Sequence, residues 1–369
     1  MKPIFEQIHS GDIEAVKSLS LNEKTVNEAD ENGMTPLAFA AANGKKPEIL
    51  TALIEAGADV NFKDEYKMTP LMYAAMLNPE VEMTDTLLEN GADLFYKDEN
   101  GMTALLWAAK ENRNPAVCTF LVDCGADINE RDKKFNVNAL MIAAKENGNP
   151  AVVSLLIALG ARVNETTVNG MTALMLASGK NANPAVAAAL ITGGADIAMK
   201  DKDGYTALLY AAESNINPAV AEFLIVHGAD LSAKNNKGAS ALFLAATRNP
   251  APAVIHTLVK YGADVHEKDA FLSATPLLWA AALNPNPRII EAFLEEGADI
   301  NETIKGRTAL MAAAGSNPNP AVIGFLLEKG MDPAVVDKEG ATALDYAKNN
   351  KALQGTEAML HLMPTSVKE

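Results

Sequence analysis

The stretch NRNPAV, Asn112 to Val117, decides how this chain folds because it returns along the sequence. It recurs as NGNPAV from Asn147, NANPAV from Asn181, NINPAV from Asn215 and NPNPAV from Asn317. The successive starts are separated by 35, 34, 34 and 102 residues, and the last interval is three times 34. A fixed period of this length is typical of solenoids, in which each unit touches only its neighbours. The 369 residues therefore favour one elongated repeat array over two or three ordinary domains.

The composition is that of a folded, acidic protein. Apolar residues make up 49% of the chain and charged residues 21%, which is enough apolar surface to bury a continuous core. Lys and Arg total 31 against 47 Asp and Glu, so the net charge of −16 repels phosphate backbones and anionic membranes. We therefore expect neither nucleic acid nor a membrane as a partner.

Three features bear on localisation. The first residues, MKPIFEQIHSGDIEAV, carry scattered charges rather than the apolar core of a secretory signal. No window of the sequence approaches the apolar length that a membrane span needs. Cys118 and Cys124 are predicted to lie on different sides of one helix, too far apart for a disulfide. These features predict a cytoplasmic protein with reduced cysteines.

Two further markers recur in step with the opening motif. One is a Thr-Pro/Ala-Leu step or its Asn or Ser variant, which begins at Thr35, Thr69, Thr103, Asn138, Thr172, Thr206, Ser240, Thr275, Thr308 and Thr342. The other is Gly-Ala-Asp, which begins at Gly57, Gly91, Gly125, Gly194, Gly228, Gly262 and Gly297. The order of these markers predicts two helices and a turn in each unit.

Each marker has a physical role in the predicted helix pair. Thr or Ser caps the first helix, and Pro is the favoured first helical residue. An Ala pair such as Ala108 and Ala109 keeps one face of this helix thin enough for close packing. The first Asn of the motif is predicted to end the first helix in the left-handed conformation, and the second Asn to cap the second helix. The Gly of Gly-Ala-Asp then ends the second helix.

The turn between units follows the pattern Asp-x-x-Gly, as in Asp98 to Gly101, with Gly supplying a positive φ. Three turns lack this Gly, and each of them carries an aromatic residue: Tyr66, Phe135 or Phe271. Exposed aromatic tips indicate contact with a partner. The alternative is that each ring packs on the neighbouring turn.

Thr69 to Ala75 (TPLMYAA), Leu87 to Asp93 (LLENGAD) and Asp98 to Gly101 resemble the ankyrin repeat family. The resemblance covers nearly the whole chain. Thr-Pro/Ala-Leu is followed by an apolar residue where the family has His, and the Asn-x-Asn-Pro corner lengthens the period to 34. Arrays of this sort are similar to those of bacterial and protist ankyrin proteins. The resemblance implies an all-α solenoid of helix-turn-helix units joined by hairpin-like turns and curved with a concave face.

We expect a single ankyrin-repeat domain over residues 1–369. Residues 1–32 are predicted to form an N-terminal cap, residues 33–339 about nine repeats of ~34 residues, and residues 340–369 a C-terminal cap. Caps with polar outer faces keep an open stack soluble.

Catalytic and metal-binding motifs are missing from the sequence. The five histidines fall in different units, and there is no HExxH, CxxC, P-loop or G-x-S-x-G pattern. Catalysis needs groups within hydrogen-bond reach of one another, whereas every segment here belongs to the repeat. We therefore predict no enzymatic activity, no metal site and no cofactor.

Candidate binding residues lie where the units differ. The residue before each Thr, which we call the turn-exit residue, is apolar in six consecutive units: Met34, Met68, Met102, Val137, Met171 and Tyr205. The resemblance implies that this position faces the concave side, where a Met-lined strip suits a peptide or helix. The alternative is packing in the core. The first-helix aromatics Phe39, Tyr73, Trp107, Tyr210 and Trp279 recur regularly and are predicted to pack between repeats.

These observations predict a non-enzymatic, monomeric protein–protein interaction module that binds an unidentified protein or peptide through its concave face and turn tips. The predicted partner-binding residues are Met34, Tyr66, Met68, Met102, Phe135, Val137, Met171, Tyr205 and Phe271. Two alternatives remain open: an architectural or self-assembling scaffold, and a secreted bacterial effector that binds a host protein.

Overall fold

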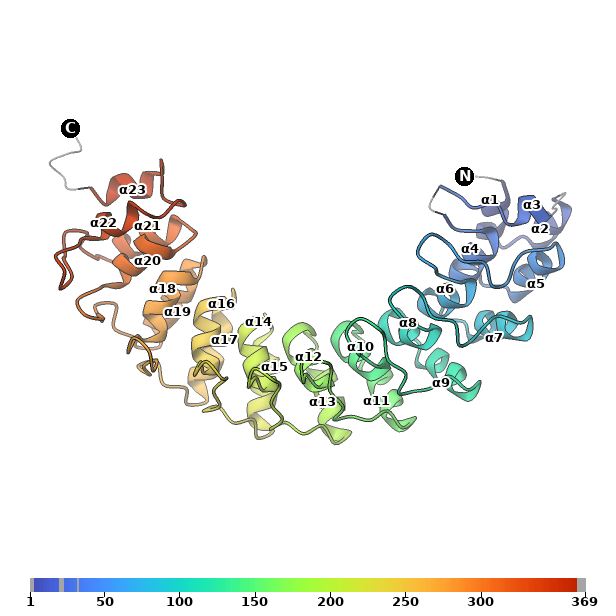
Figure 1. The fold of residues 1–369 in the computed structure, drawn as a ribbon, viewed down its shortest axis with the longest axis horizontal. Helices are drawn as coiled ribbons and strands as arrows, with labels where there is room; N and C mark the ends of the chain where they lie inside the picture. The colour runs from blue at the N-terminus through green and yellow to red at the C-terminus, as the bar shows by residue number, and fades with distance from the viewer. Residues whose placement is uncertain (1–2, 20–22, 32, 364–369) are drawn as a thin grey trace. The chain divides into compact units, whose positions relative to one another are not determined.

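A computed structural model describes residues 3–19, 23–31 and 33–363. Regular structure in these residues is helical apart from two isolated β-bridges, Arg131 with Asn138 and Ile304 with Arg307. Three short helices come first: α1 (Pro3–Ser10), α2 (Ile13–Ser18) and α3 (Glu23–Val26). Ten helix pairs follow along the chain (Figure 1).

The first helices of the pairs are short and similar in length. They are α4 (Pro36–Asn43), α6 (Pro70–Leu77), α8 (Ala104–Glu111), α10 (Ala139–Glu146), α12 (Ala173–Lys180), α14 (Ala207–Ser214), α16 (Ala241–Arg248), α18 (Pro276–Leu283), α20 (Ala309–Ser316) and α22 (Ala343–Ala347). The second helices are α5 (Pro47–Glu55), α7 (Val81–Glu89), α9 (Pro115–Asp123), α11 (Pro150–Ala158), α13 (Pro184–Thr192), α15 (Pro218–Val226), α17 (Pro252–Lys260), α19 (Pro287–Glu295), α21 (Ala321–Glu328) and α23 (Glu357–His361).

The chain divides into two compact units. The first unit comprises Met1–Ala177 with Ala188–Asp196, and the second comprises Ser178–Ala187 with Ile197–Glu369. Within the first unit, the first helices α4, α6, α8 and α10 pack on one another in chain order. Within the second unit, the first helices α14, α16, α18, α20 and α22 also pack in chain order. Helix pairs lie where the sequence predicts the two end caps, at α1–α2 and at α22–α23.

The first helices form as the sequence predicts. In α8, the hydroxyl of Thr103 accepts a hydrogen bond from the amide of Leu106 at 3.3 Å, which caps the helix. The Ala108–Ala109 pair is fully buried. Small side chains at these positions let neighbouring first helices approach closely, so the core runs through the stack of first helices within each unit.

The first Asn of the recurring motif does not adopt the predicted left-handed conformation. Asn112 is extended, with φ −74° and ψ 126°, and its side chain is buried. The Asn112 amide donates to the main-chain oxygens of Ala75 at 2.9 Å and Asn78 at 2.7 Å in the preceding repeat. Asn112 still ends α8 as predicted, with its backbone amide donating to the Ala108 carbonyl at 2.9 Å. The extended conformation turns its side chain inward, where it bridges two repeats.

The second Asn caps the second helix, as predicted. The side-chain oxygen of Asn114 accepts from the amide of Ala116 at 3.1 Å, and Pro115 is the first helical residue. The side-chain amide of Asn114 also donates to the carbonyl of Pro79 at 2.6 Å. The helix then terminates before Gly125, whose φ of 104° confirms the predicted role of this Gly.

An Asp organises most of the turns between helix pairs, and Thr167 and Asn235 take its place in two of them. One oxygen of Asp98 accepts from the amides of Asn100 at 2.8 Å and Met102 at 2.9 Å. The other accepts from the indole nitrogen of Trp107 at 3.1 Å. The sequence interpretation of the first-helix aromatics missed this hydrogen bond, because spacing along the chain does not show that the ring reaches back to its own turn.

Gly supplies the positive φ in most turns, as Gly101 does at 81°. In the three turns without Gly, the left-handed position is occupied by Lys67 (φ 60°), Asn136 (φ 57°) and Ser273 (φ 58°). The aromatic residues of these turns therefore do not replace Gly in the backbone. They stand one or two positions before the strained residue.

Candidate functional site

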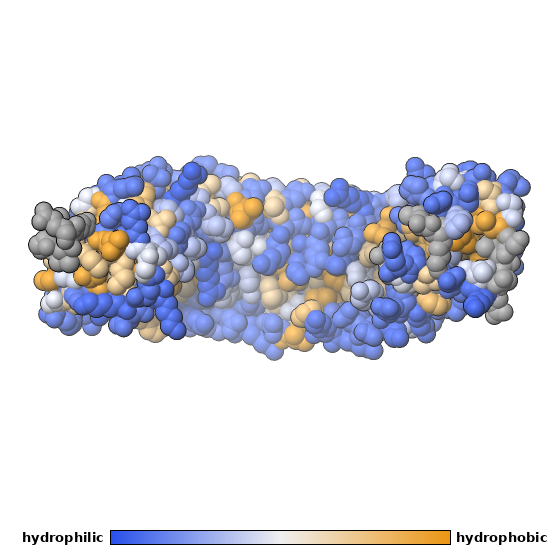
Figure 2. Space-filling model, turned by 90° about the horizontal axis from the view of Figure 1, so that it is seen from above, coloured by the Kyte–Doolittle hydropathy of each residue, from blue (hydrophilic) through white to orange (hydrophobic). Residues whose placement is uncertain are grey.

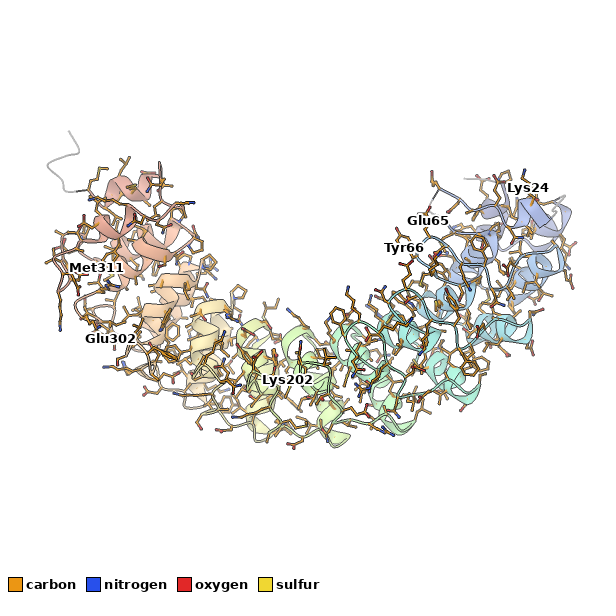
Figure 3. The ribbon with its side chains drawn as sticks, in the orientation of Figure 1. Lys24, Glu65, Tyr66, Lys202, Glu302 and Met311 are labelled. Atoms are coloured by element: carbon orange, nitrogen blue, oxygen red, sulfur yellow. The ribbon has the colours of Figure 1, made fainter. Side chains whose placement is uncertain are left out.

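The three aromatic turn tips project into solvent. Tyr66 is 70% exposed, Phe135 55% and Phe271 79%. Figure 3 places Glu65 and Tyr66 on the loop that precedes α6, on the opposite side of α6 from α7. The exposure of the rings shows that the neighbouring turns do not cover them, which disfavours the packing alternative.

The turn-exit residues are less exposed than the sequence predicts. Met68 and Met102 are buried, at 6% and 8% exposure, so the prediction of an open methionine strip is wrong at these two positions. The amide of Met68 donates to the Asp64 carboxylate at 2.8 Å, and its carbonyl accepts from the Asp64 amide at 3.2 Å. These two bonds hold the residue at the base of the turn. The remaining turn-exit residues are half-buried: Met34, Val137, Met171 and Tyr205.

Four of the predicted residues meet in one cavity of about 390 Å³ in the first unit. This first-unit cavity lies over α8, α10 and α12, and its predicted lining residues are Met102, Phe135, Val137 and Met171. Its apolar lining is completed by residues that the sequence interpretation missed as binding residues: Trp107, Met141, Ile142, Val168 and Leu176. Val168 is 51% exposed and lies at the next turn tip after Phe135.

The first-unit cavity is bordered by charges at the ends of the first helices. Lys110 and Lys145 occupy equivalent positions, two residues before the first Asn of the motif. Glu146 lies 2.9 Å from Lys145 and 3.5 Å from Lys110. Burial opposes ionisation of Glu146, but hydrogen bonds and the charges of the two lysines lower the pKa of its carboxyl group. Aligning the residues before the motif would have revealed this pair.

Cation–π contacts hold two of the lysines that line the cavity over aromatic rings. The Lys110 ammonium lies 5.0 Å from the centre of the Trp107 ring, and the Lys134 ammonium lies 5.1 Å from that of Phe135. Asp132 accepts hydrogen bonds from the amides of Phe135 and Val137, which orders the turn. The cavity therefore combines an apolar floor with lysines whose ammonium groups lie over aromatic rings.

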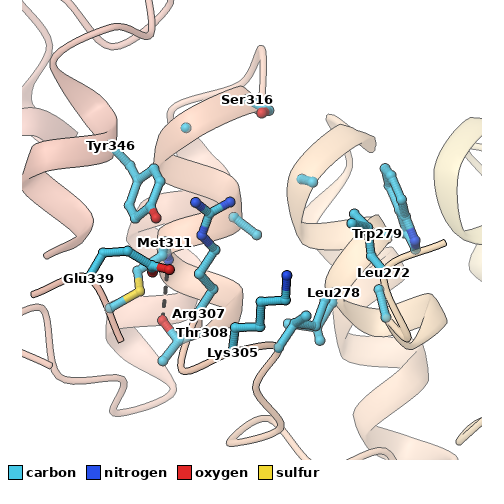
Figure 4. Close-up of a pocket in the computed structure, with 15 residues that line it drawn as sticks. Leu272, Leu278, Trp279, Lys305, Arg307, Thr308, Met311, Ser316, Glu339 and Tyr346 are labelled. Carbon is cyan, nitrogen blue, oxygen red and sulfur yellow. Dashed lines mark hydrogen bonds between the residues drawn. The ribbon is translucent and has the colours of Figure 1, made fainter. Parts of the chain in front are cut away.

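Two of the cavities in the second unit share Trp279. One, of about 340 Å³, is lined by the predicted residues Tyr205 and Phe271 together with Lys237 and Arg248. The other, of about 380 Å³, is lined by Leu272, Lys305, Arg307 and Tyr346 (Figure 4). We call them the second-unit cavities. Met34, Tyr66 and Met68 line none of the three cavities.

The face of the molecule shown in Figure 2 is mainly hydrophilic, with apolar residues in separate patches. No helix in the described ranges is both long and apolar enough to cross a membrane. Among the same residues, no group of three or more His, Cys, Asp or Glu side chains is placed to hold a metal ion. Cys118 is buried, Cys124 is exposed, and both are free thiols.

Capped helix pairs joined by turns that a polar side chain organises, in most cases an Asp, define this protein as a helical repeat solenoid. The family model for ankyrin repeats (3 copies) matches residues 4–98, 41–132, 105–197, 178–269 and 277–365, so the chain belongs to the ankyrin repeat family. The crystal structure of the human ASB11 ankyrin repeat domain is 26% identical and has a TM-score of 0.50. The match covers 61% of this chain and 97% of that one. No curated protein matches the chain.

Ankyrin repeats are in general protein–protein interaction modules, and the family is typically non-enzymatic. Membership therefore gives the class of function. It names neither a partner nor the surface that binds one.

Proposed function

We propose that this chain is a non-enzymatic binding protein that holds a segment of a partner protein over the first helices and turn tips. The observation that carries the proposal is the first-unit cavity, where Phe135 and Val168 from consecutive turns stand exposed above an apolar floor. Ligand sites are concave and mostly apolar, with a few placed polar groups. The lysines at the ends of α8 and α10 provide such groups here.

The energetic role of each residue in this proposal follows from its exposure. Phe135 and Val168 keep more than half of their surface exposed to water in the folded chain. A bound partner would remove that surface from water, so these two residues are the candidate hot spots. Met102, Met141 and Leu176 form the floor and support the fold. Val137 and Met171 are half-buried and contribute both to the binding surface and to the support of the fold.

The test is quantitative affinity capture of partners from a cell lysate with the full chain and with the double variant Phe135→Ser, Val168→Ser. Both residues are more than half exposed, so the variant should fold, each change costing within about 0.5 kcal/mol. Captured partner should fall at least roughly tenfold if these side chains are hot spots.

Phe95→Ser provides the matched control, because Phe95 is 69% exposed in the first unit but does not line the cavity. It should leave capture unchanged. Equal capture by the double variant and the original chain, with circular dichroism showing both folded, would overturn the proposed surface.

A further inference from the structure

The second-unit cavities flank a turn tip that exposes two large apolar residues in succession. Phe271 is 79% exposed and borders one cavity, while Leu272 is 51% exposed and borders the other. Leu283, at the end of α18, adds a further side chain that is 42% exposed. Apolar side chains gathered at cavity mouths mark sites of interaction.

The backbone of this tip is held rigidly by Asp269. Its carboxylate accepts from the amides of Phe271 at 2.7 Å, Leu272 at 2.7 Å and Ala274 at 2.9 Å. It also accepts from the indole nitrogen of Trp279 at 2.9 Å. A tip that is ordered before binding loses little conformational entropy when a partner docks.

These hydrogen bonds also occupy the carboxylate oxygens of Asp269, which are then not free to accept from a partner. Burial opposes its ionisation, but donation from Leu272, Trp279 and the neighbouring amides outweighs burial and lowers the pKa of the carboxyl group. The carboxylate faces four donors of its own chain. Its negative charge is therefore directed into the turn.

The charged side chains that line these cavities are mainly cationic: Lys237, Arg248, Lys305 and Arg307, against the carboxylates of Asp269 and Glu339. Arg248 is paired with Glu213, and Arg307 lies 3.6 Å from Asp337 and over the Tyr346 ring. Among residues 3–19, 23–31 and 33–363, no carboxylate oxygen lies within 4.0 Å of the Lys237 or Lys305 ammonium. Figure 4 shows Lys305 and Arg307 side by side in one cavity.

Resting on the proposed binding role, we propose that the second-unit cavities bind an acidic segment of a partner protein that carries large apolar side chains. The apolar side chains pack against Phe271, Leu272 and Trp279, and the carboxylates pair with Lys237, Lys305 and Arg307. Charge complementarity selects this occupant, because Lys237 and Lys305 line cavities on either side of an apolar tip and pair with no carboxylate among the residues that the structure describes.

The experiment measures binding of short, fluorescein-labelled synthetic peptides to the full chain by fluorescence anisotropy. The test peptide consists of Glu and Asp residues around two Leu residues. In one control peptide Lys replaces every acidic residue, and in another Ala replaces both Leu residues. The test peptide should bind more tightly than either control, and its affinity should fall as salt is added.

Charge-reversal variants locate the site. Lys237→Glu and Lys305→Glu should each weaken binding of the test peptide by roughly tenfold. Lys260→Glu makes the same change in net charge on α17, where Lys260 pairs with Glu222 at the surface, and should have no effect. The double variant Phe271→Ser, Leu272→Ser should also weaken binding while leaving the helical signal intact.

Several outcomes would overturn the inference. One is that the test peptide fails to bind, and another is that Lys260→Glu weakens its binding as much as Lys237→Glu and Lys305→Glu do. Tighter binding of a single-stranded oligonucleotide than of the test peptide would also contradict the inference. Dimerisation in analytical ultracentrifugation that disappears in the Phe271→Ser, Leu272→Ser variant would assign the surface to a second copy of the chain. If the Phe135→Ser, Val168→Ser variant were the only one to lose peptide binding, the binding site would be assigned to the first-unit cavity. The proposed function would then stand, and this inference would be wrong.

Discussion

The side-chain amide of Asn284 donates to the main-chain oxygen of Asn249, one repeat earlier, at 2.9 Å. Asn249 makes the same bond to Asn215, and Asn317 makes it to Asn284. Each of these side chains also reaches a second carbonyl, that of Ala246 in the case of Asn284. The residues form a buried ladder that ties consecutive repeats together through the corner between their helices.

The ladder predicts a large difference between the two Asn residues of one motif. Asn284→Ala should destabilise the chain by roughly 2 to 4 kcal/mol, because two buried carbonyls lose their donor. Asn286→Ala should cost about 1 kcal/mol, because Asn286 is a half-buried helix cap whose side-chain amide donates one bond, to the exposed carbonyl of Pro250. Urea unfolding followed by circular dichroism measures both. Equal losses would show that the buried ladder adds nothing beyond capping.

The hydrogen bonds to the turn Asp predict a pH effect at the alkaline end. The Tyr210 hydroxyl donates to Asp201 at 2.6 Å. Burial, followed by the bond to Asp201 and its charge, raises the pKa of this phenol above the ordinary 10.0. A group with a raised pKa in the folded state contributes stability that is complete below its unfolded pKa and is lost as pH rises through the folded value.

The stability difference between the original chain and Tyr210→Phe should therefore stay constant up to about pH 9 and shrink above about pH 10. Tyr73→Phe should behave in the same way, because the Tyr73 hydroxyl donates to Asp64 at 2.6 Å and the pKa of Tyr73 is also raised. Denaturant unfolding across this pH range measures the difference. A difference that grows with alkalinity would contradict the assigned hydrogen bond.

Left-handed strain at turns without Gly predicts a stabilising substitution. Lys67 has a φ of 60°, a conformation that costs a residue with a Cβ atom roughly 1 to 2 kcal/mol. Lys67→Gly removes this strain but adds freedom to the unfolded chain, so a net gain of roughly 0.5 to 1 kcal/mol is expected. Glu65→Gly in the same turn has no positive φ to relieve and should not stabilise. Urea unfolding midpoints measure both variants. A higher midpoint for Glu65→Gly, or a lower midpoint for Lys67→Gly, would disprove the role of strain.

The sequence by itself determined the repeat, the order of the elements and most of their ends. Thr103, Asn114, Pro115 and Gly125 act locally, on amides or backbone angles within a few residues, so their spacing alone predicts where helices begin and end. The family resemblance rests on these same local markers.

The tertiary structure decided everything that depends on a neighbour in space. The conformation of Asn112 is set by carbonyls of the preceding repeat, and the burial of Met68 by the turn that it closes. The first-unit cavity likewise draws Phe135 and Val168 from the turns of different repeats. Such relationships depend on how one repeat is stacked on the next. A pattern of spacings within a single repeat does not contain that information, because stacking is fixed by packing and hydrogen bonds between repeats.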